Sequence, residues 1–156
     1  MKPASISEIK KTLFSLENEE VIELCLRLTK YKKENKELLN YLLFESADKM
    51  AFLNKAKKEI ESLFDELNHM NAYFLKKGLR KILKLINKYA KHVNDDGFEV
   101  DMLLHFCKLF NNDIKEAKRN VILSNIFDIQ KKKIEKIVVK LHEDLQYDYN
   151  VELEKL

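Results

Sequence analysis

Two spacings in this sequence place a carboxylate and an imidazole on the same side of a helix, where they could share a metal ion. They are Glu66-x-x-His69 and Asp101-x-x-x-His105, and residues three or four apart are neighbours on a helix surface. The first spacing occurs in di-iron helical bundles, but that chemistry needs a second such pair and a glutamate from each of two further helices. The sequence holds no second Glu-x-x-His. We therefore predict no metal site, and a structural or solvated role for both pairs.

The two cysteines lack the surroundings of a catalytic thiol. Cys25 lies among leucines and Cys107 follows a phenylalanine, whereas a reactive thiolate needs an electropositive, partly exposed setting. We expect both thiols to be buried and reduced, as in a cytosolic protein. A disulfide between them is the less favoured alternative.

Glycine-dependent chemistry is also missing, because the chain has only Gly78 and Gly97. Phosphate-binding loops need several glycines to bring backbone amides against the phosphate. The 26 acidic residues offer many carboxylate pairs, but none has the signature of an apolar cleft. We predict that the protein is not an enzyme and has no bound cofactor. A glycine inside a helix costs about 1 kcal/mol relative to alanine, so Gly78 predicts the close approach of a neighbouring helix.

The most distinctive chemistry lies in residues 73–93, where seven basic residues and no acidic residue fall on one side of a predicted helix. At 100° per residue the cations cover an arc of about 140°, and apolar residues cover an opposite arc of roughly 160°. The candidate anion-binding or partner-binding surface consists of Lys77, Arg80, Lys81, Lys84, Lys88 and Lys91.

Three interpretations of this segment stay open. The first is a core helix with a solvated lysine face, which the wide apolar arc favours. The second is a helix that binds an anionic partner, either a nucleic acid or an acidic protein surface. Such binding would be salt-sensitive and weakly sequence-specific, because Arg80 alone offers bidentate geometry. The third is a helix that lies on a membrane surface, which the lack of tryptophan disfavours.

The elements that must position these residues are helices joined by short polar connections. Two glycines and one proline are too few for the turns of a sheet protein, and the apolar periodicity predicts about seven helices. Ser5 and Glu8 form a capping box, Asn18 and Asn71 are predicted to cap later helices, and residues 94–97 are the strongest loop signal.

Apolar residues at helical spacing also predict which faces are buried. The second helix is expected to bury Val21, Leu24, Cys25 and Leu28. A helix in the second half of the chain is expected to bury Val100, Leu103, Leu104, Cys107 and Phe110.

A length of 156 residues with 46% hydrophobic residues predicts a single all-α domain over residues 1–156, folded as a multi-helix bundle. A faint echo between residues 37–44 and 101–110 raises stacked antiparallel helix pairs, which would make a HEAT-like right-handed superhelix. A compact irregular bundle is the alternative. Residues 143–156 carry five acidic residues and one basic residue. This acidic C-terminal tail is expected either to fray or to dock on the basic helix near Arg80 and Lys84.

The formal net charge of +3 is nearly balanced, so any electrostatic function must come from local clustering. The N-terminal residues contain no apolar signal segment, and no apolar run approaches the ~18 residues needed to span a bilayer. We therefore expect a cytoplasmic protein with no membrane partner.

Three segments carry a resemblance to a known group of proteins: TKYKKENKELLNYLLFE (residues 29–45), KKGLRKILKLINKYAKHV (residues 76–93) and LHEDLQYDY (residues 141–149). They resemble stretches of an uncharacterised family of all-helical bacterial proteins from Bacteroidetes-type genomes. The resemblance implies a compact bacterial cytosolic domain and brings no site with it. We therefore expect a non-enzymatic protein-interaction or scaffold module with a protein partner. Weakly sequence-specific binding of nucleic acid through residues 73–93 is the alternative.

Overall fold

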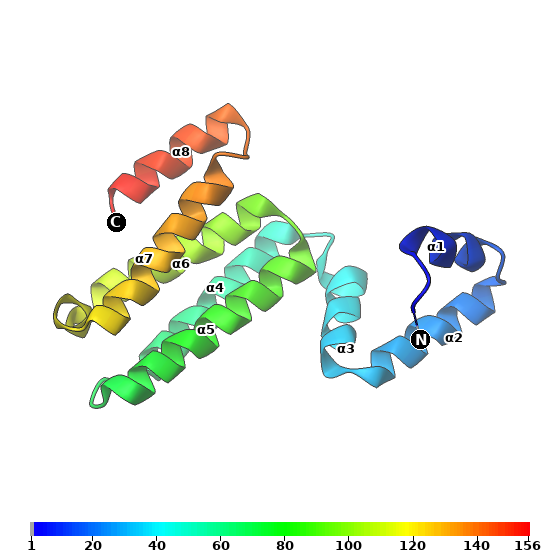
Figure 1. The fold of residues 1–156 in the computed structure, drawn as a ribbon, viewed down its shortest axis with the longest axis horizontal. Coiled ribbons are helices and arrows are strands. Elements are labelled where there is room, and N and C mark those ends of the chain that lie inside the picture. The colour runs from blue at the N-terminus through cyan, green and yellow to red at the C-terminus, as the bar shows by residue number, and fades with distance from the viewer. Residues whose placement is uncertain (1) are drawn as a thin grey trace. The chain divides into compact units, whose positions relative to one another are not determined.

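The computed structural model describes residues 2–156, apart from the side chains of residues 116 and 118. Over these residues the chain is all-helical, as predicted, with eight α-helices, one π-helical turn, one 3-10 turn and no strand (Figure 1). The chain falls into two compact units, residues 1–44 and 45–156. The expectation of one domain stays a prediction, because compact units within a chain need not fold separately.

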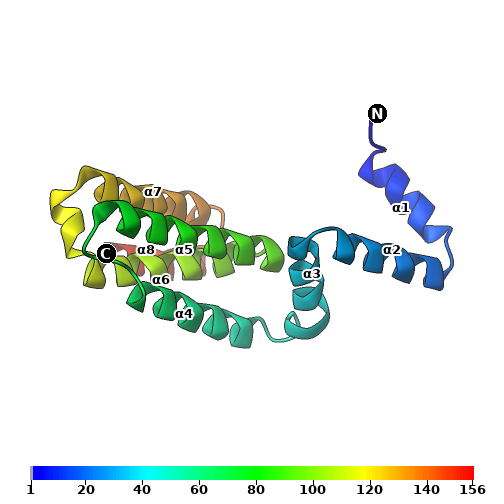
Figure 2. The same cartoon turned by 90° about the horizontal axis from the view of Figure 1, so that it is seen from below.

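The first unit consists of three short helices that follow one another along the chain (Figure 2). They are α1 (Ile6–Phe14), α2 (Asn18–Tyr31) and α3 (Lys33–Asn40), and α3 continues into the π-helical turn Tyr41–Glu45. Helices α2 and α3 pack against each other. The polar segment between them shortens to Lys32, whose extended backbone separates the two helices.

Local capping explains where α1 and α2 begin. Ser5 and Glu8 form the predicted capping box, in which the Ser5 amide donates to Glu8 Oε2 at 2.8 Å. The predicted cap at Asn18 is wrong by one residue: Glu17 is the N-cap, and its amide donates to Glu20 Oε2 at 3.0 Å. A glutamate three residues into the helix satisfies an otherwise orphaned amide in both cases.

The second unit holds five longer helices. They are α4 (Lys49–Asp65), α5 (Ala72–Val93), α6 (Asp96–Asp113), α7 (Val121–Val138) and α8 (Glu143–Glu154), with a 3-10 turn at Lys115–Arg119. Asn71 caps α5 as predicted, because its side chain accepts hydrogen bonds from the amides of Tyr73 and Phe74.

The connection between α5 and α6 is shorter than the predicted loop at residues 94–97. Asn94 ends α5 in the left-handed region, with φ 51°, a conformation that asparagine tolerates better than most residues. Asp95 then caps α6 by accepting from the Phe98 amide at 2.8 Å. Helix α6 therefore begins at Asp96, and Gly97 lies in its first turn.

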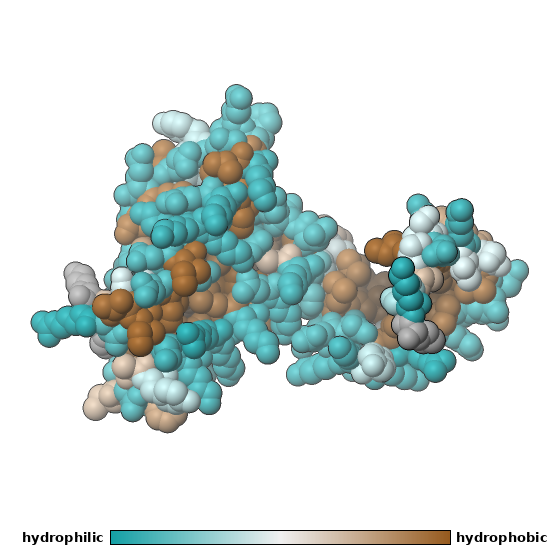
Figure 3. Space-filling model, viewed as in Figure 1, coloured by the Kyte–Doolittle hydropathy of each residue, from teal (hydrophilic) through white to brown (hydrophobic). Residues whose placement is uncertain are grey.

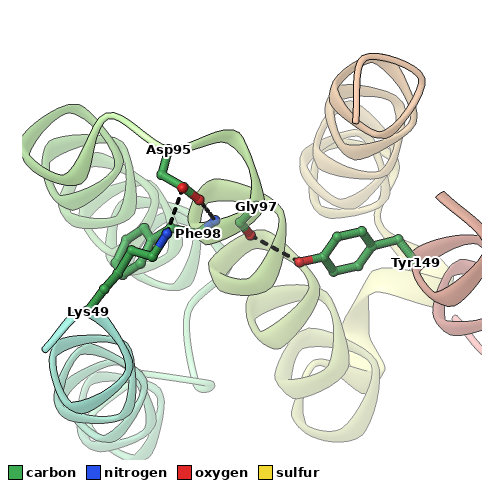
Figure 4. A network of polar contacts seen from close by, with 5 residues as sticks. All are labelled: Lys49, Asp95, Gly97, Phe98 and Tyr149. Carbon is green, nitrogen blue, oxygen red and sulfur yellow. Dashed lines mark hydrogen bonds and ion pairs between the residues drawn. The ribbon is translucent and has the colours of Figure 1, made fainter. Parts of the chain in front are cut away.

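Helix α6 is the centre of the second unit. It contacts α4, α5 and α7. Helices α4 and α8 lie on opposite sides of it, and α5 and α7 lie above it, one toward each side (Figure 4). The helices thus form two layers, one of α4, α6 and α8 and the other of α5 and α7. The HEAT-like right-handed superhelix of stacked antiparallel helix pairs stays a prediction.

The core of the second unit forms where these layers meet. The five residues predicted to be buried on α6 are all buried, which confirms this face. The ring centroids of Phe64 and Phe106 lie 5.4 Å apart, and those of Phe110 and Phe127 lie 5.5 Å apart. Burying such a side chain stabilises a fold by about 1.5–3 kcal/mol, so these aromatic contacts of α6 with α4 and α7 contribute to the stability of the unit.

The predicted core face of α2 is wrong. Leu24, Cys25 and Leu28 are exposed, and Val21 is half-buried. Among the described residues of the first unit, Tyr41 alone is buried. Three short helices offer too little surface to cover one another's apolar sides, so the amphipathic pattern of α2 does not lead to burial there.

Gly78 has the close neighbour that its position predicts, although the neighbour is a connecting residue and not a helix. A Cβ atom added to Gly78 would lie 2.5 Å from Leu67 Cδ2, in the segment between α4 and α5. The absence of a side chain therefore lets this segment pack closely on α5.

The acidic C-terminal segment forms helix α8 and does not dock on the basic helix. Leu153 is buried, Glu152 pairs with Lys108 of α6, and the Asn111 side chain donates to the Leu156 carbonyl at 2.8 Å. Helix α8 lies on the far side of α6 from α5 (Figure 4). The predicted docking near Arg80 and Lys84 is therefore wrong.

Candidate functional site

Helix α5 is a core helix with a cationic outer side. Its buried residues are Leu75, Leu79, Ile82, Ile86 and Ala90. Of the six predicted surface residues, Lys88 is half-buried, with its Nζ 5.5 Å from the centroid of the Tyr89 ring. The other five are exposed: Lys77, Arg80, Lys81, Lys84 and Lys91.

These five exposed cations have no anionic neighbour close enough to neutralise them. Within the described part of the chain none of them makes an ion pair or a side-chain hydrogen bond. Because α5 itself contains no acidic residue, their charges add along about 20 Å of helix, from the rise of 1.5 Å per residue. The side is therefore free to attract an anion.

Helix α7 packs on α6, as α5 does, and adds further cations that the sequence did not predict as part of this surface. Lys133 Nζ lies 2.8 Å from Asn87 Oδ1 of α5 and 2.5 Å from Glu99 Oε1 of α6. Lys136 and Lys140 follow one and two turns later and are exposed. The run of lysines at 131–133 was visible in the sequence, but nothing local shows that it lies next to α5.

The two layers of the second unit differ in charge. Helices α5 and α7 carry eleven basic and two acidic residues, whereas α4, α6 and α8 carry five basic and twelve acidic residues. The near-neutral total therefore hides a positive layer and a negative layer. Salt largely screens the interaction between exposed charges that lie more than about 8–10 Å apart. Each layer therefore presents its own sign to solvent.

The first unit offers a different kind of surface, which is apolar. Phe14, Leu28, Leu43 and Phe44 are 80%, 61%, 63% and 75% exposed, and apolar side chains are visible at the surface of this unit (Figure 3). A groove of about 440 Å³ lies along α2. It is lined by Leu16 of the connecting segment before α2 and by Glu20, Glu23, Leu24 and Arg27 of α2.

The carboxylate and imidazole pairs considered as metal ligands have other surroundings. Glu66 caps the end of α4 and His69 lies beyond it, so this pair shares no helix face. His105 Nε2 lies 3.0 Å from Glu61 Oε1 of α4. Burial lowers the pKa of His105, although Glu61 opposes this shift. His105 is therefore a neutral side chain in the contact between α4 and α6.

Polar contacts at the start of α6 join three helices (Figure 4). Lys49 of α4 lies 2.6 Å from Asp95, and the Tyr149 hydroxyl of α8 donates to the Gly97 carbonyl at 3.3 Å. Burial raises the pKa of Asp101, and burial together with the Asp101 carboxylate raises the pKa of Tyr149 to about 12. These groups hold α4, α6 and α8 together.

Among the described residues, no three His, Cys, Asp or Glu side chains come together in a way that could hold a metal ion. Burial raises the pKa of the Cys107 thiol to about 12, so it is protonated at neutral pH and unreactive. In the same part of the chain no helix combines the length and apolarity that crossing a bilayer requires.

The fold and its surfaces define an all-helical protein with an apolar surface on its first unit and a cationic surface on its second. The chain matches no known protein family, and no curated protein or solved structure matches it either.

Proposed function

We propose that the protein is a non-enzymatic helical interaction module that binds another protein. The observation that carries this proposal is the exposure of large apolar side chains throughout the first unit. We call them the N-terminal apolar surface: Ile6, Ile9, Leu13, Phe14, Ile22, Leu24, Leu26, Leu28, Tyr31, Leu38, Leu42, Leu43 and Phe44.

The N-terminal apolar surface consists of many exposed apolar side chains and not of one or two. Single apolar residues are common on protein surfaces, but contiguous apolar patches mark interaction sites. The amphipathic pattern of α2 is that of a helix with one buried side, and its apolar residues remain exposed. A partner that covers Leu24 and Leu28 would complete the burial that the pattern requires.

The groove along α2 gives this surface an anchor point. Leu16 and Leu24 line it with apolar side chains, and Glu20, Glu23 and Arg27 line it with charged ones. An apolar anchor surrounded by polar residues is the usual anatomy of a protein–protein contact. Such a groove favours a partner that inserts one apolar side chain.

The same proposal places the protein in the cytoplasm of a bacterium. Both cysteines are free, which suits a reducing compartment. The bacterial origin rests on the sequence resemblance alone.

The test compares the wild type with the double variant Leu24→Glu/Leu28→Glu in affinity purification from native host extract, followed by mass spectrometry. We expect a partner that the wild type retains and the double variant loses. Because both leucines are exposed, their replacement should leave the helical circular dichroism spectrum unchanged.

The matched control is Lys30→Glu, an exposed residue on the same helix. It should retain the partner as the wild type does. A set of retained proteins that is the same for all three forms would contradict the proposal.

A second candidate function, weakly sequence-specific nucleic-acid binding through α5, is favoured by one observation. Lys77, Arg80, Lys81, Lys84 and Lys91 are exposed and lack an ion pair among the described residues. Lysines without a protein partner are suited to phosphate groups. Binding of generic duplex and single-stranded nucleic acid at low salt tests it, with Lys77→Glu/Lys84→Glu/Lys88→Glu as the variant that should not bind.

A further inference from the structure

We propose that α5 and α7 together form one face that binds the phosphate backbones of a nucleic-acid duplex. This inference rests on the second candidate function and adds a second helix to it. We define the α5–α7 basic face as Arg80, Lys84 and Lys91 of α5 with Lys136 and Lys140, which lie at and just after the end of α7.

The Lys133 side chain links α7 to Asn87 of α5. Their 2.8 Å hydrogen bond joins positions 46 residues apart in the sequence. On α5, Lys84 and Lys91 lie three and four residues from Asn87, so they share its side of the helix. On the second helix, Lys136 lies three residues after Lys133 and shares its side for the same reason.

No unpaired acidic residue interrupts this face. Lys133 already pairs with Glu99, and α5 has no acidic residue. The acidic residues of α7 are Asp128 and Glu135. At 100° per residue they lie about 140° and 160° around the helix from Lys133, and so on its other side.

The two rows of cations suit the two strands of a duplex. Helix α6 packs against both α5 and α7, so the cations form two rows, one on each helix. The two strands of a B-form duplex border each groove, and each strand can therefore meet one row. Arg80 and Lys91 are 11 positions apart, which corresponds to about 16 Å along α5.

The side chains of the face are suited to phosphates and not to bases. Arg80 is the one arginine among four lysines, and the amide of Asn87 is engaged with Lys133. Sequence readout relies on arginine, asparagine or glutamine at base edges. The face should therefore bind duplexes of any sequence.

The charge of the layers orients the molecule on such a ligand. The layer of α4, α6 and α8 has twelve acidic and five basic residues. This layer therefore repels a polyanion. At physiological salt the screening length is about 8 Å, which is close to the separation of the layers. The acidic layer therefore does not cancel the attraction at the outer side of α5 and α7.

The experiment measures fluorescence anisotropy of labelled 20-base-pair DNA and RNA duplexes of arbitrary sequence at about 50 and 200 mM salt. Three charge reversals of equal size are compared in the full chain. They are Lys84→Glu/Lys91→Glu on α5, Lys136→Glu/Lys140→Glu on α7, and the control Lys11→Glu/Lys30→Glu on α1 and α2.

We expect the wild type to bind duplex at low salt and the α5 and α7 reversals each to weaken binding about tenfold or more. Each lost phosphate contact should reduce the slope of log K against log salt by about 0.9. The control reversal should change binding by less than about twofold, since its lysines lie outside α5 and α7. Lys136→Gln/Lys140→Gln provides a milder version if the charge reversal impairs folding.

The results of this experiment distinguish a face formed by α5 and α7 from nucleic-acid binding by α5 alone. Weakening by the α5 reversal but not by either α7 variant would leave the candidate function standing and overturn the two-helix face. No binding by the wild type at low salt would overturn both. Equal weakening by the control would show that net charge alone acts, and equally strong competition by polyglutamate would show that the face takes an acidic protein.

Discussion

At the level of single residues, burial outweighs the charged neighbours of Asp101 and His105. Asp101 has Lys57 and Lys108 nearby, yet burial raises its pKa, and His105 has Glu61 within 3.0 Å, yet burial lowers its pKa. Both shifts favour the neutral form. The pair that has the spacing of metal ligands is therefore half-buried in a helix contact that disfavours its charged forms.

His105 should make the protein less stable as the pH falls. Its pKa in the folded chain is lower than the usual 6.5, so the unfolded chain binds more protons below that pH and folding loses free energy there. Chemical denaturation at about pH 7.5 and pH 5.5 should show a smaller loss of stability for His105→Gln than for the wild type. Equal losses of stability in His105→Gln and in the wild type would contradict the prediction.

At the level of elements, α5 is fixed at both ends by an asparagine. The Asn71 side chain accepts from the amides of Tyr73 and Phe74, and Asn94 ends the helix with φ 51°. Between them the helix buries Leu79, Ile82 and Ile86 almost completely. The two asparagines fix where α5 begins and ends, while its apolar periodicity decides which side faces the core and which side carries the lysines to solvent.

Removing the first cap should destabilise the second unit. Asn71→Ala leaves the Tyr73 and Phe74 amides without their acceptor and should lower the free energy of unfolding by about 0.5–2 kcal/mol. Asn71→Asp keeps the acceptor and adds a favourable charge at the helix N-terminus, so it should stay close to the wild type. Urea denaturation measures both; an alanine variant as stable as the aspartate variant would show that the cap contributes nothing.

At the level of the whole molecule, the two units differ in how many buried apolar residues they contain. All the buried apolar residues except Tyr41 lie in residues 45–156. The first unit exposes its apolar sides, and the second unit encloses its own and exposes cations. Each unit therefore presents its own kind of surface, apolar on the first and cationic on the second.

The second unit should therefore fold without the first. A fragment of residues 45–156 is expected to unfold cooperatively, with a thermal midpoint close to that of the full chain, whereas residues 1–44 alone should melt without a sharp transition. Circular dichroism melting curves measure this. Residues 45–141, which lack Leu153 and the partners of Lys108 and Asn111, form the control and should be less stable than 45–156. A fragment 45–156 that fails to unfold cooperatively would show that the first unit completes its core.

The sequence by itself determined the features that depend on near neighbours along the chain. The all-helical class, the caps at Ser5 and Asn71 and the two-sided character of α5 follow from interactions within about four residues, and all are present in the structure. The buried face of α6 was also predictable, because its apolar residues recur at helical spacing on a helix that lies between others.

Only the tertiary structure decided which of these faces is covered. The apolar face of α2 has the same periodicity as that of α6, but its unit supplies no helix to cover Leu24 and Leu28. The acidic tail pairs with Lys108, 44 residues before Glu152, and Lys133 meets Asn87 across 46 residues. Burial and charge pairing depend on neighbours that chain folding brings together, and periodicity within one helix does not show which neighbours those are.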